Sequence, residues 1–210
     1  MTWTELEARS APYGLILMGT MHDAGGTVAL LGAGPEMWPR FTASGEFADG
    51  QPDPLDRWSK RVLGGLAASL DATTVFPSDG PPYPPFIAWA RASGRFWQSP
   101  TGMLVHDRAG LMVSLRGALR IVGERPLAAG QAPNPCESCA ERPCATACPV
   151  GALSAARPYD VPACKAHITS PAGADCMSDG CRARRACPVS QFFGRDPEQS
   201  AFHMRAFVAG

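Results

Sequence analysis

The chain has no excess of either charge, because 19 Lys and Arg residues balance 19 Asp and Glu residues. A balanced composition gives no electrostatic reason to expect DNA or a membrane surface as a partner. No apolar run approaches the roughly 18 residues that span a bilayer, and the first residues lack the basic start and apolar core of a secretion signal. We therefore expect a cytoplasmic protein with no membrane and no DNA partner.

The composition also lacks the marks of a disordered chain. Of the 210 residues, 45% are hydrophobic and only 18% are charged, which is enough apolar surface to build a core. Glycine and proline are abundant, with 22 and 21 residues, so we expect long and shaped loops.

Cysteine is absent from the first 135 residues and then occurs eight times. The first four form the run Cys136-x2-Cys139-x4-Cys144-x3-Cys148, followed by Pro149. Bacterial ferredoxins bind [4Fe–4S] clusters with the run C-x2-C-x2-C-x3-C-P, and here only the middle gap is longer, by two residues. Close spacing lets one loop wrap a cube, and the proline turns the chain away afterwards. The run predicts iron–sulfur binding.

The last four cysteines are more widely spaced, and Pro188 again follows the last of them. In two-cluster ferredoxins the fourth cysteine of a run binds the other cluster. The same exchange here predicts two [4Fe–4S] clusters with no thiolate left over. Cluster 1 is expected to take Cys136, Cys139, Cys144 and Cys187, and cluster 2 to take Cys148, Cys164, Cys176 and Cys181.

Eight cysteines also have two other common uses. They allow 105 disulfide pairings, but disulfides are rare in the reducing compartment that we expect. Zinc prefers two separated cysteine pairs for each tetrahedral site, which the crowded first run fits poorly. The nearby Arg182, Arg184 and Arg185 have two interpretations. They could offset the negative charge of a cluster and raise its potential, or form an ordinary solvated segment.

The domain boundary is expected where Pro126, Gly130, Pro133 and Pro135 give a linker composition. We predict an α/β domain over residues 1–125 that binds a corrinoid or a partner, a linker over 126–135, a ferredoxin-like module over 136–195 and a C-terminal tail over 196–210.

Hydrophobic periodicity and turn residues predict the elements of the first domain. Thr4 and Glu7 suit the capping box of an opening helix, and Asp53 followed by Pro54 suits the start of another. After Pro54, apolar residues recur at three- and four-residue steps as far as Leu70. Strands are expected over residues 13–19, 27–31 and 73–76, a loop over 77–85, a short helix over 86–92, and a hairpin joining residues 103–106 to 111–115.

The cysteine pattern resembles the ferredoxin-like module of epoxyqueuosine reductases and, more distantly, that of corrinoid reductive dehalogenases. Residues 27–41, 53–70 and 102–117 are similar to segments of the corrinoid-binding domain of that superfamily, especially of the MMACHC-type cobalamin-processing proteins. The resemblance implies an α+β fold in which a flavin-reductase-like α/β domain precedes a dicluster ferredoxin-like module. It also implies bound cobalamin.

The resemblance suggests roles for few further residues. Arg116 matches a strand-end arginine near the ligand pocket of the cobalamin-processing proteins, which makes it a candidate cofactor-binding residue. Asp79 lies one residue out of register with the aspartate proton donor of epoxyqueuosine reductases and is the candidate catalytic acid. His22 echoes part of a cobalamin-ligating motif, but Thr20 replaces its aspartate, so we expect a turn there.

Three functions are compatible with these features. The chain could be a reductase that passes electrons from its clusters to a corrinoid, which then acts on a small-molecule substrate. It could be a ferredoxin-type electron carrier without corrinoid. It could also be a cobalamin-processing protein that reduces the corrinoid and hands it on. Each requires a low-potential electron donor such as a flavodoxin or a ferredoxin.

Overall fold

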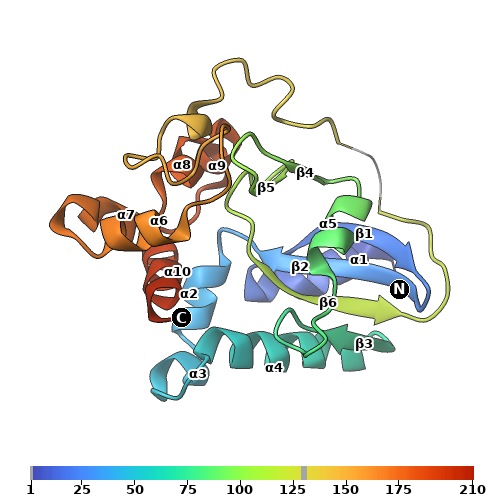
Figure 1. The fold of residues 1–210 in the computed structure, drawn as a ribbon. Coiled ribbons are helices and arrows are strands. Elements are labelled where there is room, and N and C mark those ends of the chain that lie inside the picture. The colour runs from blue at the N-terminus through green and yellow to red at the C-terminus, as the bar shows by residue number, and fades with distance from the viewer. Residues whose placement is uncertain (1, 129–131) are drawn as a thin grey trace. The chain divides into compact units, whose positions relative to one another are not determined.

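The structure, a computed structural model, describes residues 2–128 and 132–210 and divides into two compact units (Figure 1). The first, here called the sheet unit, comprises Met1–Arg95 and Ser114–Ala132. The second, the cysteine unit, comprises Phe96–Val113 and Pro133–Gly210. The mixed α+β composition is confirmed, and both sheets are antiparallel. The division differs from the predicted boundary, because residues 96–113 belong with the cysteines.

The sheet unit is built on a four-stranded antiparallel sheet with the order β1-β2-β6-β3. Its strands are β1 (Leu15–Asp23), β2 (Gly26–Ala33), β3 (Ala72–Val75) and β6 (Leu115–Ile121). All of β2 is buried, which explains why its sequence is continuously small and apolar instead of alternating. The expected strands over residues 13–19, 27–31 and 73–76 are therefore present, with shifted ends.

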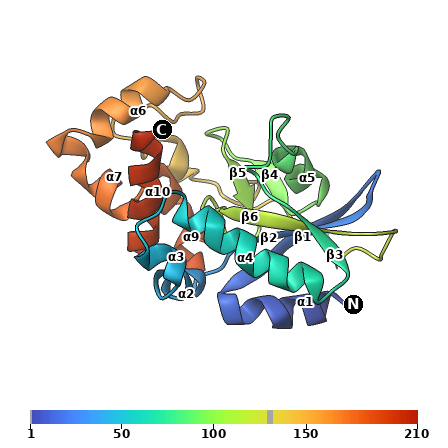
Figure 2. The same cartoon turned by 90° about the horizontal axis from the view of Figure 1, so that it is seen from below.

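Helices cover this sheet on both sides. In Figure 2 the strands run between α1 (Trp3–Ser10) and α5 (Phe86–Ala92). Helix α4 (Pro54–Ala68) packs on β3 and β6 with the predicted apolar stripe, including Trp58 and Leu63, buried. The short helices α2 (Met37–Thr42) and α3 (Gly45–Ala48) precede it in the chain.

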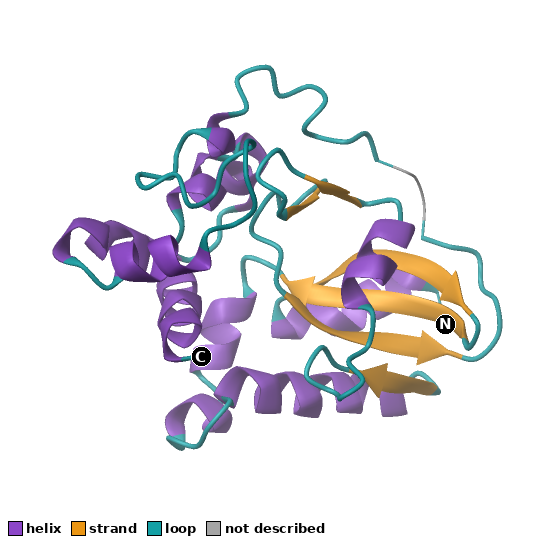
Figure 3. Ribbon diagram, viewed as in Figure 1, coloured by secondary structure: helices purple, strands orange, loops and turns teal. Residues whose placement is uncertain are grey.

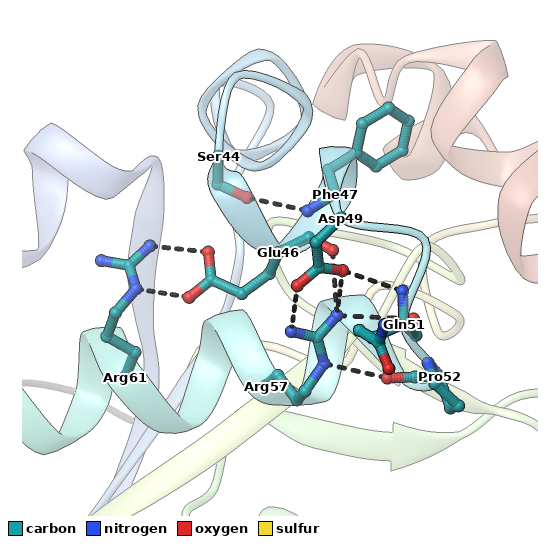
Figure 4. A network of polar contacts seen from close by, with 8 residues as sticks. All are labelled: Ser44, Glu46, Phe47, Asp49, Gln51, Pro52, Arg57 and Arg61. Carbon is teal, nitrogen blue, oxygen red and sulfur yellow. Dashed lines mark hydrogen bonds and ion pairs between the residues drawn. The ribbon is translucent and has the colours of Figure 1, made fainter.

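A polar network fastens α3 to α4. Figure 4 shows a bidentate ion pair in which two guanidinium nitrogens of Arg57 donate to the two carboxylate oxygens of Asp49, at 2.7 and 2.8 Å. Arg61 forms an ion pair with Glu46. The Ser44 hydroxyl caps α3 by accepting from the backbone N–H of Phe47 at 3.4 Å. Arg61 lowers the pKa of Glu46 to about 2 by hydrogen bonding to its carboxylate.

Two local predictions are wrong. The cap of α1 is Thr2, whose hydroxyl accepts from the N–H of Glu5 at 3.1 Å, so the helix begins two residues before the predicted capping box. The expected hairpin across Asp107 is reduced to one antiparallel bridge between His106 and Gly110, and residues 111–115 do not pair with residues 103–106. Residues 104–106 pair with residues 96–98 instead, whereas Leu115 begins β6 in the other unit.

The cysteine unit consists mostly of short helices and loops (Figure 3). Strands β4 (Phe96–Gln98) and β5 (Leu104–His106) form a small hairpin. The predicted C-terminal tail contains a helix, α10 (Pro197–Ala209), which packs on α7 (Ala174–Asp179). Its Ser200 lies so close to Gly180 that a Cβ on the glycine would stand 2.6 Å from the serine Cβ. Within the described residues, no helix is long and apolar enough to cross a bilayer.

Candidate metal centres

The first group of thiols begins on the loop that follows the expected linker. The side-chain oxygen of Asn134 accepts from the backbone N–H of Cys136 at 3.0 Å, which shapes the loop where the first cysteine emerges. A 3-10 turn over Pro143–Ala145 carries Cys144, whose side chain is buried. Proline at the start of this turn fixes its backbone and removes a donor that would have no partner. Cys139 lies between these two positions in the chain.

Cys187 joins this group from far along the chain. It lies between α8 (Arg182–Ala186) and α9 (Pro188–Phe193), where its extended backbone separates the two helices. A cavity of about 210 Å³ is lined by Cys136, Cys139, Cys144 and Cys187. Val105 and Leu111 also line it and form one apolar cluster with Cys144 and Cys187. We call this cavity and its four thiols the first centre.

Burial and mutual proximity both act on the thiols of the first centre. Burial raises the pKa of Cys144, and the neighbouring thiols of Cys187, Cys136 and Cys139 raise it further. Burial also raises the pKa of Cys136, again with a contribution from Cys187. Deprotonating these thiols is therefore unfavourable unless a cation arrives to neutralise them, as a bound metal would.

The other four cysteines surround a second cavity, and together we call them the second centre. Cys148 comes from the end of the first loop, Cys164 from α6 (Val161–Ile168), Cys176 from α7 and Cys181 from the residue before α8. The cavity between them is small, about 20 Å³, and Ile168 and Met204 also line it. A cluster bound here would push these side chains outward.

Hydrogen-bond donors point at the sulfurs of the second centre. Burial raises the pKa of the Cys181 thiol, whereas the backbone N–H groups of Arg184 and Ala183 lower it. Burial likewise raises the pKa of Cys164, and a hydrogen bond from the Tyr159 hydroxyl lowers it. Such donors stabilise a negatively charged sulfur.

The three arginines of α8 have different roles. Arg182 and Arg185 both bind the carboxylate of Asp175, at 2.6 and 2.7 Å, and these hydrogen bonds, with that of Arg182 the larger cause, lower the pKa of Asp175 to about 2. Arg184 donates to the carbonyl of Leu111 and interacts with Cys181 and Tyr159. Among the described residues, Arg184 has no acidic partner, unlike the other two arginines, and its charge interacts with the Cys181 thiol.

Helix α8 links the two centres. Cys181 precedes its first residue and Cys187 follows its last. Six residues at 1.5 Å each separate their backbones by about 9 Å along a helix. Redox groups held on these two cysteines would therefore be close neighbours.

The thiols line the two cavities without forming a ready-made site for a single metal ion in the described residues. No three His, Cys, Asp or Glu side chains in the described part of the chain lie close enough to share one metal ion. Each centre instead spreads four thiols around a cavity. A [4Fe–4S] cluster needs four separate thiolates, one for each iron.

The remaining candidate residues all lie in the sheet unit. Arg116, near the start of β6, faces Asp56 at 3.6 Å, and burial lowers its pKa. Asp79 accepts from the backbone N–H of Phe76 at 2.8 Å and lies 3.5 Å from Lys60, so it closes the turn after β3. His22 is near the end of β1, beside the β1–β2 turn, and its Nε2 is 2.8 Å from the carbonyl oxygen of Arg125. Neither Arg116 nor Asp79 shares a unit with the cysteines.

Sequence reasoning missed Tyr159 and Asp175. Nothing in the cysteine spacing signals a tyrosine that contacts Cys164 from five residues upstream. Asp175 could have been noticed, because it directly precedes Cys176 and three arginines follow within ten residues.

Comparison of the chain with protein-family models, with curated protein sequences and with solved structures gave no match.

Proposed function

We propose that the chain is an iron–sulfur redox protein that holds one [4Fe–4S] cluster at each centre. The observation that supports this most directly is how the eight cysteines divide between two cavities. Cys187 lies with the first three cysteines, and Cys148 lies with the later three, although sequence order suggests the reverse. This exchange is the one found in two-cluster ferredoxins. None of the eight cysteines, all of which lie in the described part of the chain, forms a disulfide. This agrees with a reducing compartment, which we take to be the cytoplasm.

The residues around the centres would hold the clusters and set their properties. A bound cluster accepts and releases single electrons, with a potential that depends on hydrogen bonds to sulfur, nearby charge and solvent exposure. Tyr159 and the first N–H groups of α8 supply hydrogen bonds at the second centre. At the first centre, the buried side chains of Val105 and Leu111 supply an apolar wall. The two centres would therefore differ in potential.

Single-cysteine variants test the division between the centres. We expect Cys187→Ala to remove the same cluster signal as Cys144→Ala, and Cys148→Ala to remove the same signal as Cys164→Ala. Electron paramagnetic resonance of the reduced protein identifies the cluster that remains, and iron analysis should fall from about eight to about four per chain. If Cys187→Ala and Cys164→Ala remove the same signal, the exchange is refuted. If the anaerobically reconstituted chain is colourless and iron-free, the whole proposal fails.

We further propose that a corrinoid bound by the sheet unit receives the electrons, which come from a low-potential flavodoxin or ferredoxin. The support is the resemblance of residues 27–41, 53–70 and 102–117 to corrinoid-binding domains, together with the flavin-reductase-like fold that it implies. Of the third segment, only residues 114–117 belong to the sheet unit. Absorbance of the reconstituted protein with added cobalamin, before and after a low-potential reductant, tests this. Absence of binding leaves an electron carrier. Reduction of the corrinoid without turnover of a substrate indicates a cobalamin-processing protein.

A further inference from the structure

Leu111 is held at both of its backbone polar groups by residues that flank a ligand of the first centre. Its N–H donates to the hydroxyl oxygen of Ser190 at 2.8 Å, in a buried hydrogen bond. Its carbonyl oxygen accepts from the guanidinium group of Arg184. Ser190 follows Cys187 by three residues, and Arg184 precedes it by three. The two contacts therefore hold Leu111 from either side of Cys187.

The rest of the loop over residues 106–112 closes on itself. The ring nitrogen Nδ1 of His106 accepts from the backbone N–H groups of Arg108 and Ala109, at 3.2 and 3.1 Å. The N–H of Gly110 donates to the carbonyl of His106, and the N–H of Met112 donates to the carbonyl of Ala109, both at 2.9 Å. Among the N–H groups of residues 108–112, that of Leu111 is thus the one that reaches another element.

A glycine lets this loop lie directly against α9. The φ of Gly110 is +56°, and a Cβ at this position would stand 2.4 Å from the backbone nitrogen of Ser190 and 2.6 Å from its hydroxyl oxygen. A side chain is excluded both by this contact and by the left-handed backbone. The close approach brings the next residue, Leu111, within reach of the serine hydroxyl.

The side chain that these contacts fix is part of the wall of the first centre. Leu111 is 1% exposed and belongs to the apolar cluster that contains Cys144 and Cys187. It also lines the cavity of the first centre. Water close to an iron–sulfur cluster favours the more negative, reduced state, so an apolar wall lowers the potential.

We propose that Ser190 and Arg184 are positioning residues that hold Leu111 against the first cluster and thereby keep the potential of that cluster low. The inference rests on the proposed function, because it requires a cluster at the first centre. Arg184 also interacts with Cys181 of the second centre. Ser190 therefore acts on the first cluster alone, whereas Arg184 acts on both.

The substitution Ser190→Ala removes the acceptor of the Leu111 N–H and leaves every cysteine in place. We expect unchanged iron content, a higher potential for the first cluster, and roughly fivefold faster deuterium exchange of residues 106–113. Potentiometric titration followed by electron paramagnetic resonance measures the potentials, and peptide-level mass spectrometry measures the exchange. Ser178→Ala, at an exposed serine of α7, is the control and should change none of the three.

Two further variants separate the wall from the residues that hold it. Leu111→Ala shortens the wall itself and should raise the potential of the first cluster further than Ser190→Ala does. Arg184→Met should speed the exchange of residues 106–113 and should also lower the potential of the second cluster, because it removes a positive charge beside Cys181. Ser190→Ala should leave the second potential unchanged.

The outcomes distinguish this inference from the proposed function. A chain that takes up no iron refutes the clusters, whereas an iron-loaded Ser190→Ala protein with an unchanged first potential refutes the positioning role. Unchanged exchange of residues 106–113 in Ser190→Ala also refutes it, with or without iron. Should Ser190→Ala lose iron, Leu111→Ala decides the matter: a raised first potential supports the wall, and an unchanged one refutes it.

Discussion

Tyr159 is the residue through which the second centre can be adjusted without removing a ligand. Its ring stacks on Phe207 at 6.4 Å while its hydroxyl is hydrogen bonded to the sulfur of Cys164. A hydrogen bond to a ligand sulfur favours the more negative, reduced cluster and so raises the potential. We therefore expect Tyr159→Phe to lower the potential of one cluster while iron content and the other potential stay unchanged. A potentiometric titration followed by resonance spectroscopy measures this.

The matched control is Tyr83→Phe, an exposed tyrosine of the sheet unit, which should shift neither potential. If Tyr159→Phe leaves both potentials where they were, the hydroxyl does not act on the cluster. If it loses iron, Tyr159 shapes the centre instead of tuning it.

At the level of single residues, the spacing marks the cysteines as candidate ligands, but it gives no information about the side chains around them. Cysteine spacing is a local property of the chain, so the run ending in Cys148-Pro149 could be recognised directly. The contact of Tyr159 with Cys164 and that of Arg184 with Leu111 depend on how loops fold back. Asp79 was predicted as an acid by resemblance, and the structure shows its carboxylate accepting from a backbone N–H in a turn.

Among the elements, α7 and α8 are joined mainly by one carboxylate. Asp175 of α7 binds Arg182 and Arg185 of α8, and each helix brings a cysteine to the second centre. We expect Asp175→Asn to release iron from one of the two clusters several times faster in the presence of a chelator. The exposed Asp179→Asn, at the end of the same helix, is the control and should release iron at the ordinary rate. Equal rates in both variants would mean that the cysteines alone hold these helices.

The attachment of α3 to α4 should depend on pH. Glu46 is ionised in the folded protein down to its pKa of about 2, whereas its ordinary value is 4.5. The folded pKa is lowered, so the contribution to stability is full well above pH 4.5 and is lost as the pH falls from 4.5 towards 2. Because Arg61 is largely exposed, we expect Glu46→Gln to reduce the free energy of unfolding by only about 0.5–1 kcal/mol at pH 7.

Urea unfolding followed by tryptophan fluorescence checks this at pH 7 and again near pH 4. The difference between Glu46→Gln and the unchanged chain should shrink at the lower pH. A difference that is the same at both values would show that the side chain acts through packing instead of charge.

The elements that the sequence predicted well are those whose signals are local. The apolar stripe of α4 and the proline-rich loop before α5 need no knowledge of the rest of the chain. The hairpin across Asp107 was wrong for the opposite reason. Both flanking runs suit strands, but β5 pairs with β4 from earlier in the chain and Leu115 enters the other sheet. Turn residues show where a chain bends and do not show which strands pair.

For the whole molecule, the two units are stabilised by different means. The sheet unit buries an apolar core that includes Leu30, Phe41 and Trp58. In the cysteine unit, Cys144 and Cys187 belong to the apolar cluster itself, so the same side chains that would bind metal also fill the core. Short helices such as α8 and α9 have little stability of their own. Metal binding there would be part of the folding free energy of that unit.

Removal of iron should therefore unfold one unit and spare the other. We expect that chelation under reducing conditions makes the backbone amides of α6, α7 and α8 exchange with deuterium at least tenfold faster, whereas those of β2 and β6 keep their protection. Hydrogen exchange with peptide-level mass spectrometry measures both units in one sample. Cys144→Ala should show part of the same effect, around the first centre, without a chelator. If the cysteine unit stays protected after complete loss of iron, its thiols are packed as ordinary apolar side chains and the fold does not depend on the clusters.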